Sequence, residues 1–249
     1  MLFALFSCEK KDDDSTTGTV PVEHNYDPGV VITLDDDYVD NWVLADDILA
    51  AYQWKATFFV TKCNRLSTAK IEKLQGFKNY GHEIAGHGLN HLNALQFVKA
   101  NGSNAYVSQE IDPMVSFMDD NALHTTSFAY PFGARDATTD NVLLKKFKIL
   151  RGTTYGKSDP AYQYCYYTGN KVVYGLGLDN SYAHFSVPYF LSLLEYAKNN
   201  HKIVVFYAHK PVETSQNDYE TEYQTLIEIC QYVKAHNMRF YTMTELVNL

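Results

Sequence analysis

The sequence predicts a single α/β domain built as a distorted (β/α) barrel of seven or eight parallel strands. Two observations favour this fold. From Pro28 onward, short apolar runs alternate with amphipathic stretches, and no linker-like break separates them. Alternating strands and helices imply parallel strands joined by right-handed crossovers. Polar residues also follow the carboxyl ends of several expected strands, and in a β/α barrel these ends lie together on one face.

The expected strands are short apolar runs spread over the whole domain, and a chain of 249 residues has room for all of them. Seven or eight units of strand and helix make a closed or an incomplete barrel. We expect the strands at Val30–Leu34, Thr57–Thr61, Glu83–Gly86, Ser127–Tyr130, Lys148–Arg151, Val172–Leu176, Ile203–Tyr207 and Arg239–Thr242.

Between the strands, apolar residues recur at the three- and four-residue spacing of a helix face. One such face runs over Tyr223–Val233. A second, Leu191–Ala197, follows Ser186–Pro188, which supplies suitable cap and first-turn residues. Pro113 interrupts a third stretch, Tyr106–Asp120, so that helix is either kinked or begins at Pro113.

Residues 1–24 differ from the rest of the chain and are expected to be a lipoprotein-type signal remnant and a polar linker, which leaves 25–249 as the folded domain. Met1-Leu-Phe-Ala-Leu-Phe-Ser-Cys8 is a short apolar run that ends in a small residue and a cysteine. It resembles the end of a bacterial lipoprotein signal, whose cysteine is lipidated. The resemblance implies a cell-envelope protein, periplasmic or on the outer surface of a Gram-negative bacterium, that meets the membrane only through a lipid anchor at Cys8. The alternative is a frayed apolar start on a soluble protein.

Charge and composition narrow the class of ligand. The formal net charge is −8, and the basic runs, such as Lys10-Lys11, are no longer than two residues. This balance argues against nucleic acid or another polyanion as partner and favours a neutral or cationic ligand. The 20 tyrosines become denser between Tyr155 and Tyr189. Aromatic faces can hold sugar rings, although half-buried packing is the simpler role for any single tyrosine.

The cysteines other than Cys8 are Cys63, Cys165 and Cys230. Three cysteines cannot all pair, and none has the Cys-x2-Cys spacing of a thiolate zinc site. Neither a disulfide framework nor a cysteine metal site is indicated. Cys230 falls on an apolar helix face and is expected to be a small core residue.

Two histidines four residues apart, His87 and His91, and three consecutive carboxylates, Asp35, Asp36 and Asp37, carry the strongest chemical signal. Two imidazoles and one carboxylate can hold a divalent cation such as zinc and leave positions open for water and substrate. A second carboxylate beside them can take a proton from that water, so these residues predict a metal-dependent hydrolase. Two simpler readings stay open. The histidines could be neighbours on an exposed helix face, and one of the three acids is expected to cap a helix.

Four short segments carry the candidate polar residues, and they read Thr33-Leu34-Asp35-Asp36-Asp37, His87-Gly88-Leu89-Asn90-His91, Ala129-Tyr130-Pro131-Phe132-Gly133 and Ile203-Val-Val-Phe-Tyr-Ala-His209. They resemble four motifs of the NodB-type polysaccharide deacetylases, carbohydrate esterase family four. The family's motifs are Thr-Phe-Asp-Asp-Gly, His-Ser/Thr-x-x-His, Arg-x-Pro-Tyr/Phe-Gly and a hydrophobic strand that ends in a histidine. Each motif is short, but all four in the family's order over residues 28–249 make a specific match.

The resemblance implies a metal-dependent hydrolase of acetylated carbohydrate. Asp36, His87 and His91 would hold a divalent metal ion, with zinc as the first expectation and other divalent metals possible. The open positions on the metal would take water and the acetyl carbonyl.

The resemblance also implies roles in proton transfer. Asp35 would be the base that deprotonates the attacking water, and His209 would be the acid that protonates the departing amine. The backbone N–H of Phe132 would help to stabilise the tetrahedral oxyanion. A further family motif, an Asp/Trp pair that tunes the acid, has only Asp179 as a weak candidate. For His209 the simpler alternative is a hydrogen-bonded core imidazole.

The sequence departs from the family's pattern at three positions. Asp37 replaces a glycine and adds a negative charge beside the metal, and Gly88 replaces a hydroxyl residue that could steady its loop. Ala129 replaces an arginine that pairs with the base in relatives. Arg151, at the end of the next expected strand, is predicted to lie within hydrogen-bonding reach of Asp35 in its place; a surface ion pair is the alternative for Arg151.

The function expected first is N-deacetylation of an N-acetylglucosamine-type glycan. The same site chemistry serves a sugar O-acetyl esterase, so the sequence leaves both open. A third hypothesis is a catalytically weak surface glycan-binding lipoprotein on the same fold, suggested by Asp37 and Ala129. Because a binding module needs no general acid, the presence of His209 favours the enzyme.

Overall fold

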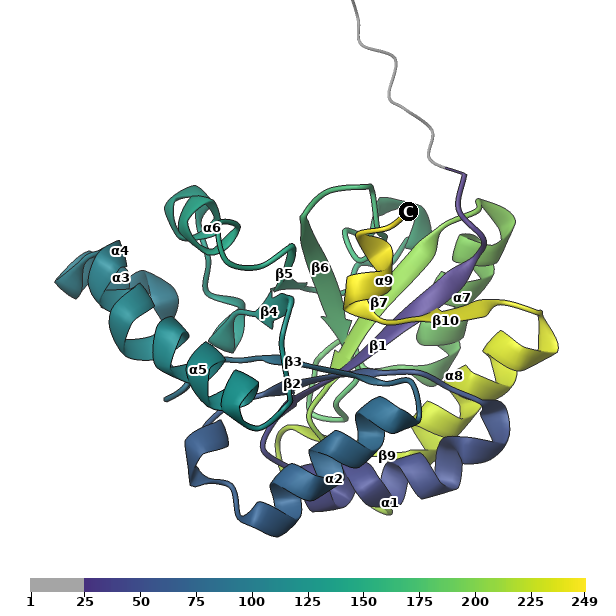
Figure 1. Cartoon of the computed structure of the whole chain (residues 1–249). Coiled ribbons are helices and arrows are strands. Elements are labelled where there is room, and N and C mark those ends of the chain that lie inside the picture. Colours follow the sequence, from purple (N-terminus) through teal and green to yellow (C-terminus); the bar gives the residue numbers. More distant parts are fainter. Residues whose placement is uncertain (1–24) are drawn as a thin grey trace, which may run out of the picture.

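Within residues 25–249, eight parallel strands form one sheet in the order β10-β1-β2-β3-β4-β5-β6-β7, and a further pairing of β7 with β1 closes it (Figure 1). The computed structural model describes residues 25–249; the predicted signal remnant with Cys8 and the polar linker lie outside the described residues. The strands are β1 (Gly29–Asp36), β2 (Thr57–Val60), β3 (Glu83–Gly86), β4 (Ser127–Ala129), β5 (Ile149–Thr154), β6 (Val172–Gly177), β7 (Ile203–Ala208) and β10 (Arg239–Tyr241). β1 to β7 form a closed parallel barrel with helices around it, which confirms the predicted fold.

β1 has one edge paired with a single strand and the other edge divided between two strands. Its residues Gly29–Leu34 pair with β7 on the first edge. On the second edge, β10 pairs with Gly29–Val31 and β2 pairs with Thr33–Asp36. β10 therefore fills the amino-terminal part of an edge that β2 leaves open, and the barrel is distorted there.

Every expected strand is present, although some ends differ from the prediction. β5 continues to Thr154, so the predicted end at Arg151 is wrong and this arginine lies inside the strand. Two further strands, β8 (Lys210–Val212) and β9 (Glu220–Glu222), pair in parallel as a small separate sheet within the described residues. Their short polar sequences have no apolar pattern that would predict them.

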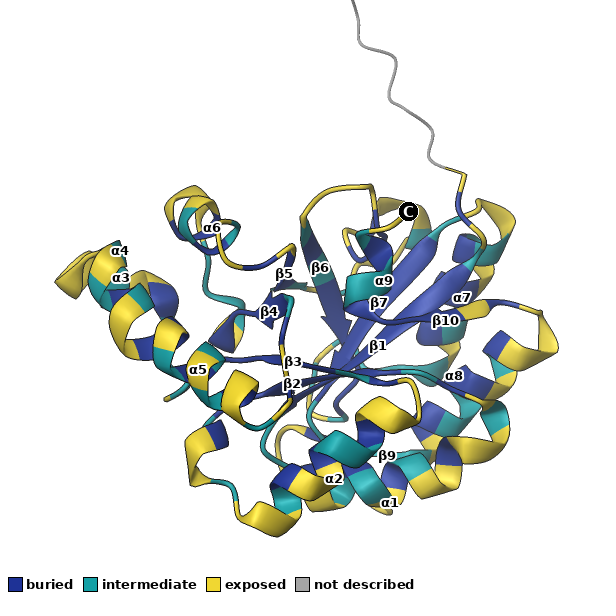
Figure 2. Cartoon of the chain, in the orientation of Figure 1, coloured by how far each residue is buried: buried dark blue, intermediate teal, exposed yellow. Residues whose placement is uncertain are grey.

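Helices cover the outside of the barrel, and their outward faces carry most of the exposed residues (Figure 2). They are α1 (Val39–Leu49), α2 (Thr68–Asn79), α3 (Ala94–Asn101), α4 (Ser103–Tyr106), α5 (Asp112–Asp120), α6 (Ala137–Leu143), α7 (Val187–Asn199), α8 (Tyr223–Ala235) and α9 (Met243–Leu246), with short helical turns η1 (Ala50–Tyr52), η2 (Cys63–Arg65), η3 (Val107–Ile111), η4 (Pro131–Gly133) and η5 (Pro160–Tyr162). In the part of the chain that the structure describes, no helix combines the length and the apolar character needed to cross a membrane.

The two amphipathic patterns correspond to α7 and α8. α7 begins at Val187, directly after Ser186, whose side chain accepts a hydrogen bond from the N–H of Tyr189 at 3.4 Å. α8 buries Cys230 together with Leu226 against the barrel, as the apolar spacing predicts. In both helices, the apolar stripe decides which face packs.

The helical run around Pro113 is continuous but irregular. α4 leads through η3, which is a π-helical turn, into α5, whose first turn holds Pro113. Proline cannot donate a hydrogen bond to the preceding turn, and a wider π turn accommodates this loss. Of the two predicted alternatives, the irregular helix is present and a new start at Pro113 is not.

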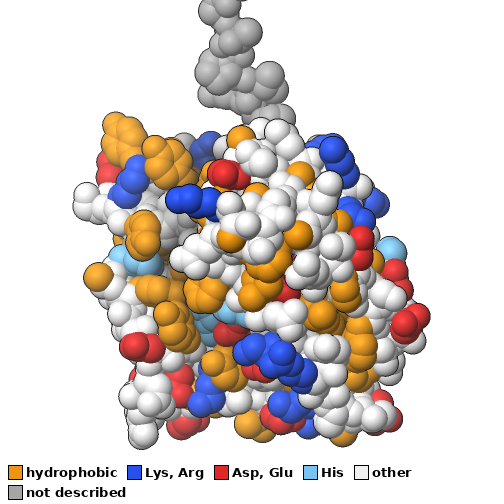
Figure 3. All heavy atoms as spheres, turned by 90° about the vertical axis from the view of Figure 1, so that its left-hand side faces the viewer, with side chains coloured by type: hydrophobic (Ala, Val, Ile, Leu, Met, Phe, Trp, Pro, Cys, Tyr) orange, Lys and Arg blue, Asp and Glu red, His pale blue; other side chains and the backbone are white. Residues whose placement is uncertain are grey.

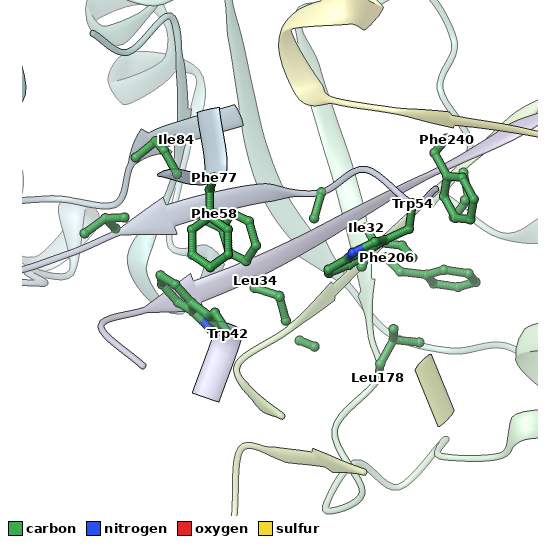
Figure 4. Packing of buried hydrophobic residues seen from close by; sticks show 14 of the residues in the cluster. Ile32, Leu34, Trp42, Trp54, Phe58, Phe77, Ile84, Leu178, Phe206 and Phe240 are labelled. Atoms are coloured by element: carbon green, nitrogen blue, oxygen red, sulfur yellow. The ribbon is translucent and has the colours of Figure 1, made fainter. Parts of the chain in front are cut away.

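An apolar layer lies between the barrel and the helices (Figure 4). Phe58 of β2 stacks on Phe77 of α2 with ring centroids 4.3 Å apart, and Trp42 of α1 lies 5.2 Å from Phe58. All three side chains are buried. Burial of a side chain of this size contributes roughly 1.5–3 kcal/mol, so this layer fixes α1 and α2 against β2.

The inside of the barrel changes character along its length. Successive side chains of a strand point to opposite faces, so alternate residues point inward. Val31, Phe59 and Val205 belong to an apolar interior cluster. Nearer the carboxyl ends of the strands, the buried side chains include Asp35 and Arg151. These two buried charges therefore lie near the carboxyl ends of the strands.

Candidate metal and catalytic site

A cavity of about 350 Å³ lies where the carboxyl ends of β1, β5 and β7 meet the adjoining loops. It contains all seven residues that the sequence predicts for the site. Figure 3, viewed from the left-hand side of Figure 1, shows histidine side chains surrounded by hydrophobic side chains on that face of the molecule. The cavity is lined by Asp35, Asp36, His87, His91, Tyr130, Phe132, Gly133, Arg151, Thr153, Thr154, Tyr155, Tyr182, His184, Tyr207, His209 and Tyr219.

Asp36, His87 and His91 place three potential ligand atoms within 4.8 Å of one another. Asp36 ends β1, and both histidines lie on the loop between β3 and α3. Asp36 Oδ1 is 3.3 Å from His91 Nε2 and 3.7 Å from His87 Nε2. The alternative of two neighbours on an exposed helix face is wrong, because neither histidine is helical and His87 is buried.

The ring of His87 is oriented by a backbone carbonyl. Its Nδ1 lies 2.9 Å from the oxygen of Ala129. A carbonyl can only accept, so Nδ1 carries the proton and the lone pair of Nε2 faces Asp36. Burial lowers the pKa of His87 to about 4, against the opposing charges of Asp35 and Asp36. A neutral imidazole with a free Nε2 is the form that binds a metal, so His87 fits the predicted ligand set.

Asp36 adopts a backbone conformation that is unusual for its residue type. Its φ is 88°, in the region that favours glycine. Such backbone positions cost energy and are concentrated at functional sites. Burial acts to raise the pKa of Asp36. The hydrogen bond from His91 and the charges of the nearby histidines outweigh burial, so the pKa of Asp36 lies well below its ordinary value. Asp36 is therefore an anionic group held in a strained position, which suits the predicted role of metal ligand.

Asp35 is paired with Arg151, as predicted. Arg151 Nη2 donates a hydrogen bond to Asp35 Oδ2, and both side chains are almost fully buried. The guanidinium carbon also lies 5.3 Å from the ring centre of Phe59 and 5.0 Å from that of Tyr207. The alternative of a surface ion pair for Arg151 is therefore wrong.

The missing arginine at position 129 has a structural replacement. Ala129 of β4 and Arg151 of β5 are register partners in adjacent strands, at the same level of the barrel. The small side chain of Ala129 is buried in the interior cluster. The positive charge is therefore supplied from β5 by Arg151, where the family's motif supplies it from the position of Ala129 on β4.

One oxygen of Asp35 remains available for chemistry. Asp35 Oδ1 is buried and has no hydrogen-bond partner among the described residues, whereas Oδ2 is taken by Arg151. Asp35 Oδ2 is 4.0 Å from His87 Nε2, so the carboxylate lies beside the potential ligands. A buried carboxylate oxygen without a partner is costly unless a water or substrate group completes it.

His209 follows β7 and is held by Asp179, the weak candidate from the sequence. Its Nδ1 lies 2.6 Å from Asp179 Oδ2, and its backbone N–H donates to Asp179 Oδ1 at 3.2 Å. Thr221 of β9 donates a further hydrogen bond to Oδ1 at 2.6 Å. Because a carboxylate can only accept, Nδ1 of His209 carries a proton and Nε2 is the nitrogen left for the cavity.

The charge environment of His209 favours its protonated form. Burial alone would lower the pKa of this histidine. The hydrogen bond and charge of Asp179, with the charges of Asp35 and Asp36, outweigh burial and raise the pKa above its ordinary value. His209 is thus an imidazole oriented and electrostatically prepared to donate a proton.

Phe132 lies at the rim of the cavity in a left-handed conformation, with φ of 62°. The residue is 67% exposed, and its ring lies 4.6 Å from the ring of His91, edge to face. The preceding Pro131 and the following Gly133 complete the turn η4. Phe132 lines the cavity, and the oxyanion contact of its backbone N–H stays a prediction.

Asp37 follows Asp36 directly but is neither among the residues that line the cavity nor in the group of potential ligands. The effect of its charge on a bound metal stays a prediction. The expectation that one of the three acids caps a helix is wrong. α1 begins after Tyr38, and no side chain caps it.

Aromatic side chains form a second wall of the cavity that the sequence did not assign. Tyr207 donates a hydrogen bond to Tyr182 across 3.0 Å, and Tyr182 stacks on His184 with ring centroids 5.4 Å apart. Burial raises the pKa of Tyr207 to about 12, so its hydroxyl stays neutral. The available signal for Tyr207 was its place two residues before His209 in the last motif; Tyr182 had none beyond the local density of tyrosine.

Comparison with known families decides the identity of this fold and site. The family described as polysaccharide deacetylase matches residues 23–147, which is half of the chain. The chain belongs to the polysaccharide deacetylase family. The match covers the first three of the four motifs, and the structure adds His209 to the same cavity. No curated protein matches the chain.

Solved structures of the same fold cover most of this polysaccharide deacetylase family member. A family 4 acetyl xylan esterase from Clostridium thermocellum in complex with a cobalt ion is 19% identical with a TM-score of 0.56, over 88% of this chain and 90% of that one. The catalytic domain of a peptidoglycan N-acetylglucosamine deacetylase from Eubacterium rectale is 15% identical with a TM-score of 0.55, over 90% and 92%. A family pseudoenzyme from Bacillus anthracis is 13% identical with a TM-score of 0.59, over 90% and 66%. Identities this low show the shared fold alone.

Proposed function

We propose that this protein is a metal-dependent hydrolase that removes acetyl groups from a carbohydrate, and that its reaction is N-deacetylation of an N-acetylglucosamine-type glycan. The observation that supports this is the meeting of three groups of side chains in one cavity: the triad Asp36, His87 and His91, the pair Asp35 and Arg151, and the pair His209 and Asp179.

The triad is the proposed metal site, with zinc as the proposed ion. Two imidazole nitrogens and one carboxylate oxygen suit zinc and similar divalent metals, and the tautomer of His87 leaves Nε2 free to ligate. A metal held there would supply Lewis acidity toward the acetyl carbonyl and a bound water that loses its proton readily. Three protein ligands leave room for both.

The chain's own residues handle the protons. Asp35 accepts a proton from the attacking water, using the oxygen that Arg151 leaves unpaired. Arg151 favours the ionised carboxylate, which is the form that a base must have. His209 donates a proton from Nε2 to the departing group, and the Phe132 N–H supports the developing oxyanion.

The acid favours an amide as the substrate bond. An amine is a poor leaving group until it is protonated, whereas an alcohol leaves an ester more readily. A histidine whose protonated form is favoured by Asp179 supports the more demanding reaction. The proposed partner is accordingly an acetylated carbohydrate, and the proposed reaction is the hydrolysis of its acetamido group.

The metal proposal is tested by zinc binding and acetate release. His91→Ala removes one ligand of the triad and is expected to lower metal occupancy sharply and to abolish acetate release, with an unchanged circular dichroism spectrum. His124→Ala is a matched control, because His124 is exposed and its side chain bonds Asp119 away from the cavity. Full activity of a verified metal-free preparation would contradict the mechanism.

Asp35 is expected to behave differently from the ligands. Asp35→Asn should keep the metal and lose about 10²–10⁴-fold of turnover, which is the usual contribution of a general base. Elemental analysis of the purified variant, together with single-turnover acetate release, measures both quantities. If Asp35→Asn loses its metal instead, Asp35 is a ligand and the division of roles between Asp35 and Asp36 is overturned.

A sugar O-acetyl esterase is the second candidate, since the same groups can hydrolyse an ester, and one structural relative is named as an acetyl xylan esterase. A comparison of kcat/KM on acetylated chitooligosaccharides and acetylated xylooligosaccharides separates the two. A third candidate, a catalytically weak glycan-binding surface lipoprotein, would bind either glycan and release acetate from neither.

We further propose a location at the cell envelope, with the lipid anchor at Cys8 as the contact with the membrane. The short apolar run that ends in Cys8 supports this. Metabolic labelling with a fatty acid tests it, with Cys8→Ser as the matched variant. Equal labelling of both forms, or of neither, would contradict a lipid anchor at Cys8.

A further inference from the structure

A buried carboxylate outside the cavity holds the loop that carries His91. Glu110 lies in η3 and is fully buried. Its two oxygens accept hydrogen bonds from the backbone N–H of Asn90 at 2.9 and 3.0 Å and from the side-chain amide of Asn90 at 3.0 Å. Glu110 Oε1 accepts another from the N–H of Leu92 at 3.1 Å. The bonded N–H groups therefore belong to the residues immediately before and after His91.

Gly88 provides the space that Glu110 occupies. A Cβ atom added to Gly88 would lie 2.5 Å from Glu110 Oε1. Gly88 also has a φ of +81°, which side chains rarely adopt. The hydroxyl residue expected between the two histidines is thus replaced by a glycine, and a carboxylate from a distant helix fills the place of its side chain.

Other hydrogen bonds near the His91 end of the loop run from Arg65 Nη2 to Asn90 Oδ1 at 3.2 Å and from the N–H of Leu89 to the backbone carbonyl of Glu110 at 3.3 Å. Thr61 Oγ1 donates to the carbonyl of Gly88 at 2.8 Å, which anchors the loop near His87. His91 itself has a φ of 61°, so its backbone requires support. Glu110 supplies this support through the flanking N–H groups. Glu110 lies in the π-helical turn η3, where side chains point in different directions from those of a regular α-helix.

We propose that Glu110 is a positioning residue of the metal site, which sets the affinity for metal by fixing the loop of His91. The inference rests on the metal site of the proposed function. Mutation of a group that hydrogen-bonds and orients a metal ligand commonly lowers metal affinity by about 10–100-fold. Glu110 acts through the backbone on both sides of His91 and not through its imidazole.

The test is a titration of the apoprotein with Zn²⁺ alone, measured by isothermal titration calorimetry. Glu110→Gln keeps the size of the side chain but turns one acceptor into a donor that faces N–H groups. We expect its zinc affinity to fall about 10–100-fold. Glu83→Gln is the matched control, because Glu83 accepts hydrogen bonds from Thr57, Ser127 and Thr244 at the opposite end of β3. The control should lose stability in urea and keep the wild-type zinc affinity.

A second variant guards against misfolding of Glu110→Gln. Gly88→Ser keeps Glu110 but forces its carboxylate aside, and it should also weaken zinc binding. In the double variant, the loss should be smaller than the product of the two single effects, since both act on one contact. Independent effects would show that Gly88→Ser acts only through backbone strain and would overturn the proposed pairing.

The outcomes also separate this inference from the proposed function. Wild-type zinc affinity in Glu110→Gln, with or without lower stability, would make Glu110 merely structural and overturn the inference alone. A second outcome combines two results: Glu110→Gln binds zinc more weakly than the wild type, and the wild type binds zinc but releases no acetate. This outcome would support the inference and overturn the proposed function. A wild-type protein that binds no zinc would overturn both.

Discussion

At the scale of single residues, two pairs of charged groups meet at the cavity, and the proposed catalytic members of the two pairs require opposite charges. In one, the cation Arg151 supports an anion, Asp35; in the other, the anion Asp179 supports a cation, the protonated form of His209. The Asp179 carboxylate raises the pKa of His209 and so favours the charge state that a general acid requires.

Asp179→Asn is expected to move the alkaline limb of the pH–rate profile to lower pH. Asp179 contributes to the raised pKa of His209, and removal of its charge lets burial lower that pKa. An acid is active only below its pKa, so the variant should lose acetate release most strongly above neutral pH and least in mildly acidic buffer. The pH dependence of kcat measures this. An alkaline limb that stays in place would show that His209 is not the acid.

Arg151→Ala is expected to destabilise the protein by about 3–5 kcal/mol, because it leaves the buried carboxylate of Asp35 without its partner. Arg151→Lys restores a positive charge without the planar fork and should recover part of the stability. Urea denaturation measures both variants. Equal stability of Arg151→Ala and the wild type would show that the pair does not stabilise the fold.

The sequence predicted the seven site residues and the pairing of Arg151 with Asp35, because each residue belongs to a motif or to the end of an expected strand. It did not predict Glu110, which bonds the loop of His91 from a helical turn, or Tyr182, which lines the cavity from a loop, because neither has a local signal. Asp179 could be named only weakly, since its contact with His209 spans 30 residues and depends on how β6 ends beside β7. Contacts of this kind are set by the fold, not by spacing.

At the scale of helices and strands, the short β8–β9 sheet completes the acid side of the site. It follows His209 directly and brings Thr221 onto Asp179. α1 reaches the same place from the other side, where Trp42 Nε1 donates to the carbonyl of His209 at 2.9 Å. The hydrophobic pattern predicted the barrel strands and α7 and α8, but it could not predict β8 and β9, which are short and polar.

Ser186→Ala is expected to destabilise the protein by about 1 kcal/mol, since Ser186 caps α7. α7 packs its apolar face against β1 and β7, so fraying of its first turn should lower the free energy of global unfolding. Urea denaturation measures the change. Ser158→Ala is a suitable control, because Ser158 is exposed and lies outside the helices and strands. Equal stability of the two variants would contradict the capping role.

At the scale of the whole molecule, exposed aromatic side chains gather at the mouth of the cavity. Phe132, Tyr155 and Tyr219 are 67%, 84% and 52% exposed, and all three line it. The sequence indicated only a region dense in tyrosine, and it could not separate those at the mouth from those packed inside. Large exposed rings beside a cavity are suited to stacking against sugar rings.

Tyr155→Ala is expected to raise KM for long acetylated glycans several-fold and to leave kcat nearly unchanged, because a stacked sugar beyond the reacting one contributes to binding and not to the chemical step. Tyr162→Ala provides the control, since Tyr162 is 71% exposed but does not line the cavity. Steady-state kinetics on a polymer and on a disaccharide measure the effect. An equal change in KM for both substrates would contradict a binding role beyond the reacting sugar.

The pairing of β1 with β7 also sets an order in time for the nascent chain. Asp36, His87 and His91 are all made within the first 91 residues, whereas β7 and His209 are made about 120 residues later. At synthesis rates of about 5–20 residues per second, this delay is roughly 6–24 s. Throughout that interval the edge of β1 that β7 will occupy has no strand to pair with, and the proposed acid is missing from the site. A partly translated chain can therefore bring together the proposed metal ligands, but the proposed acid joins them only when β7 closes the barrel.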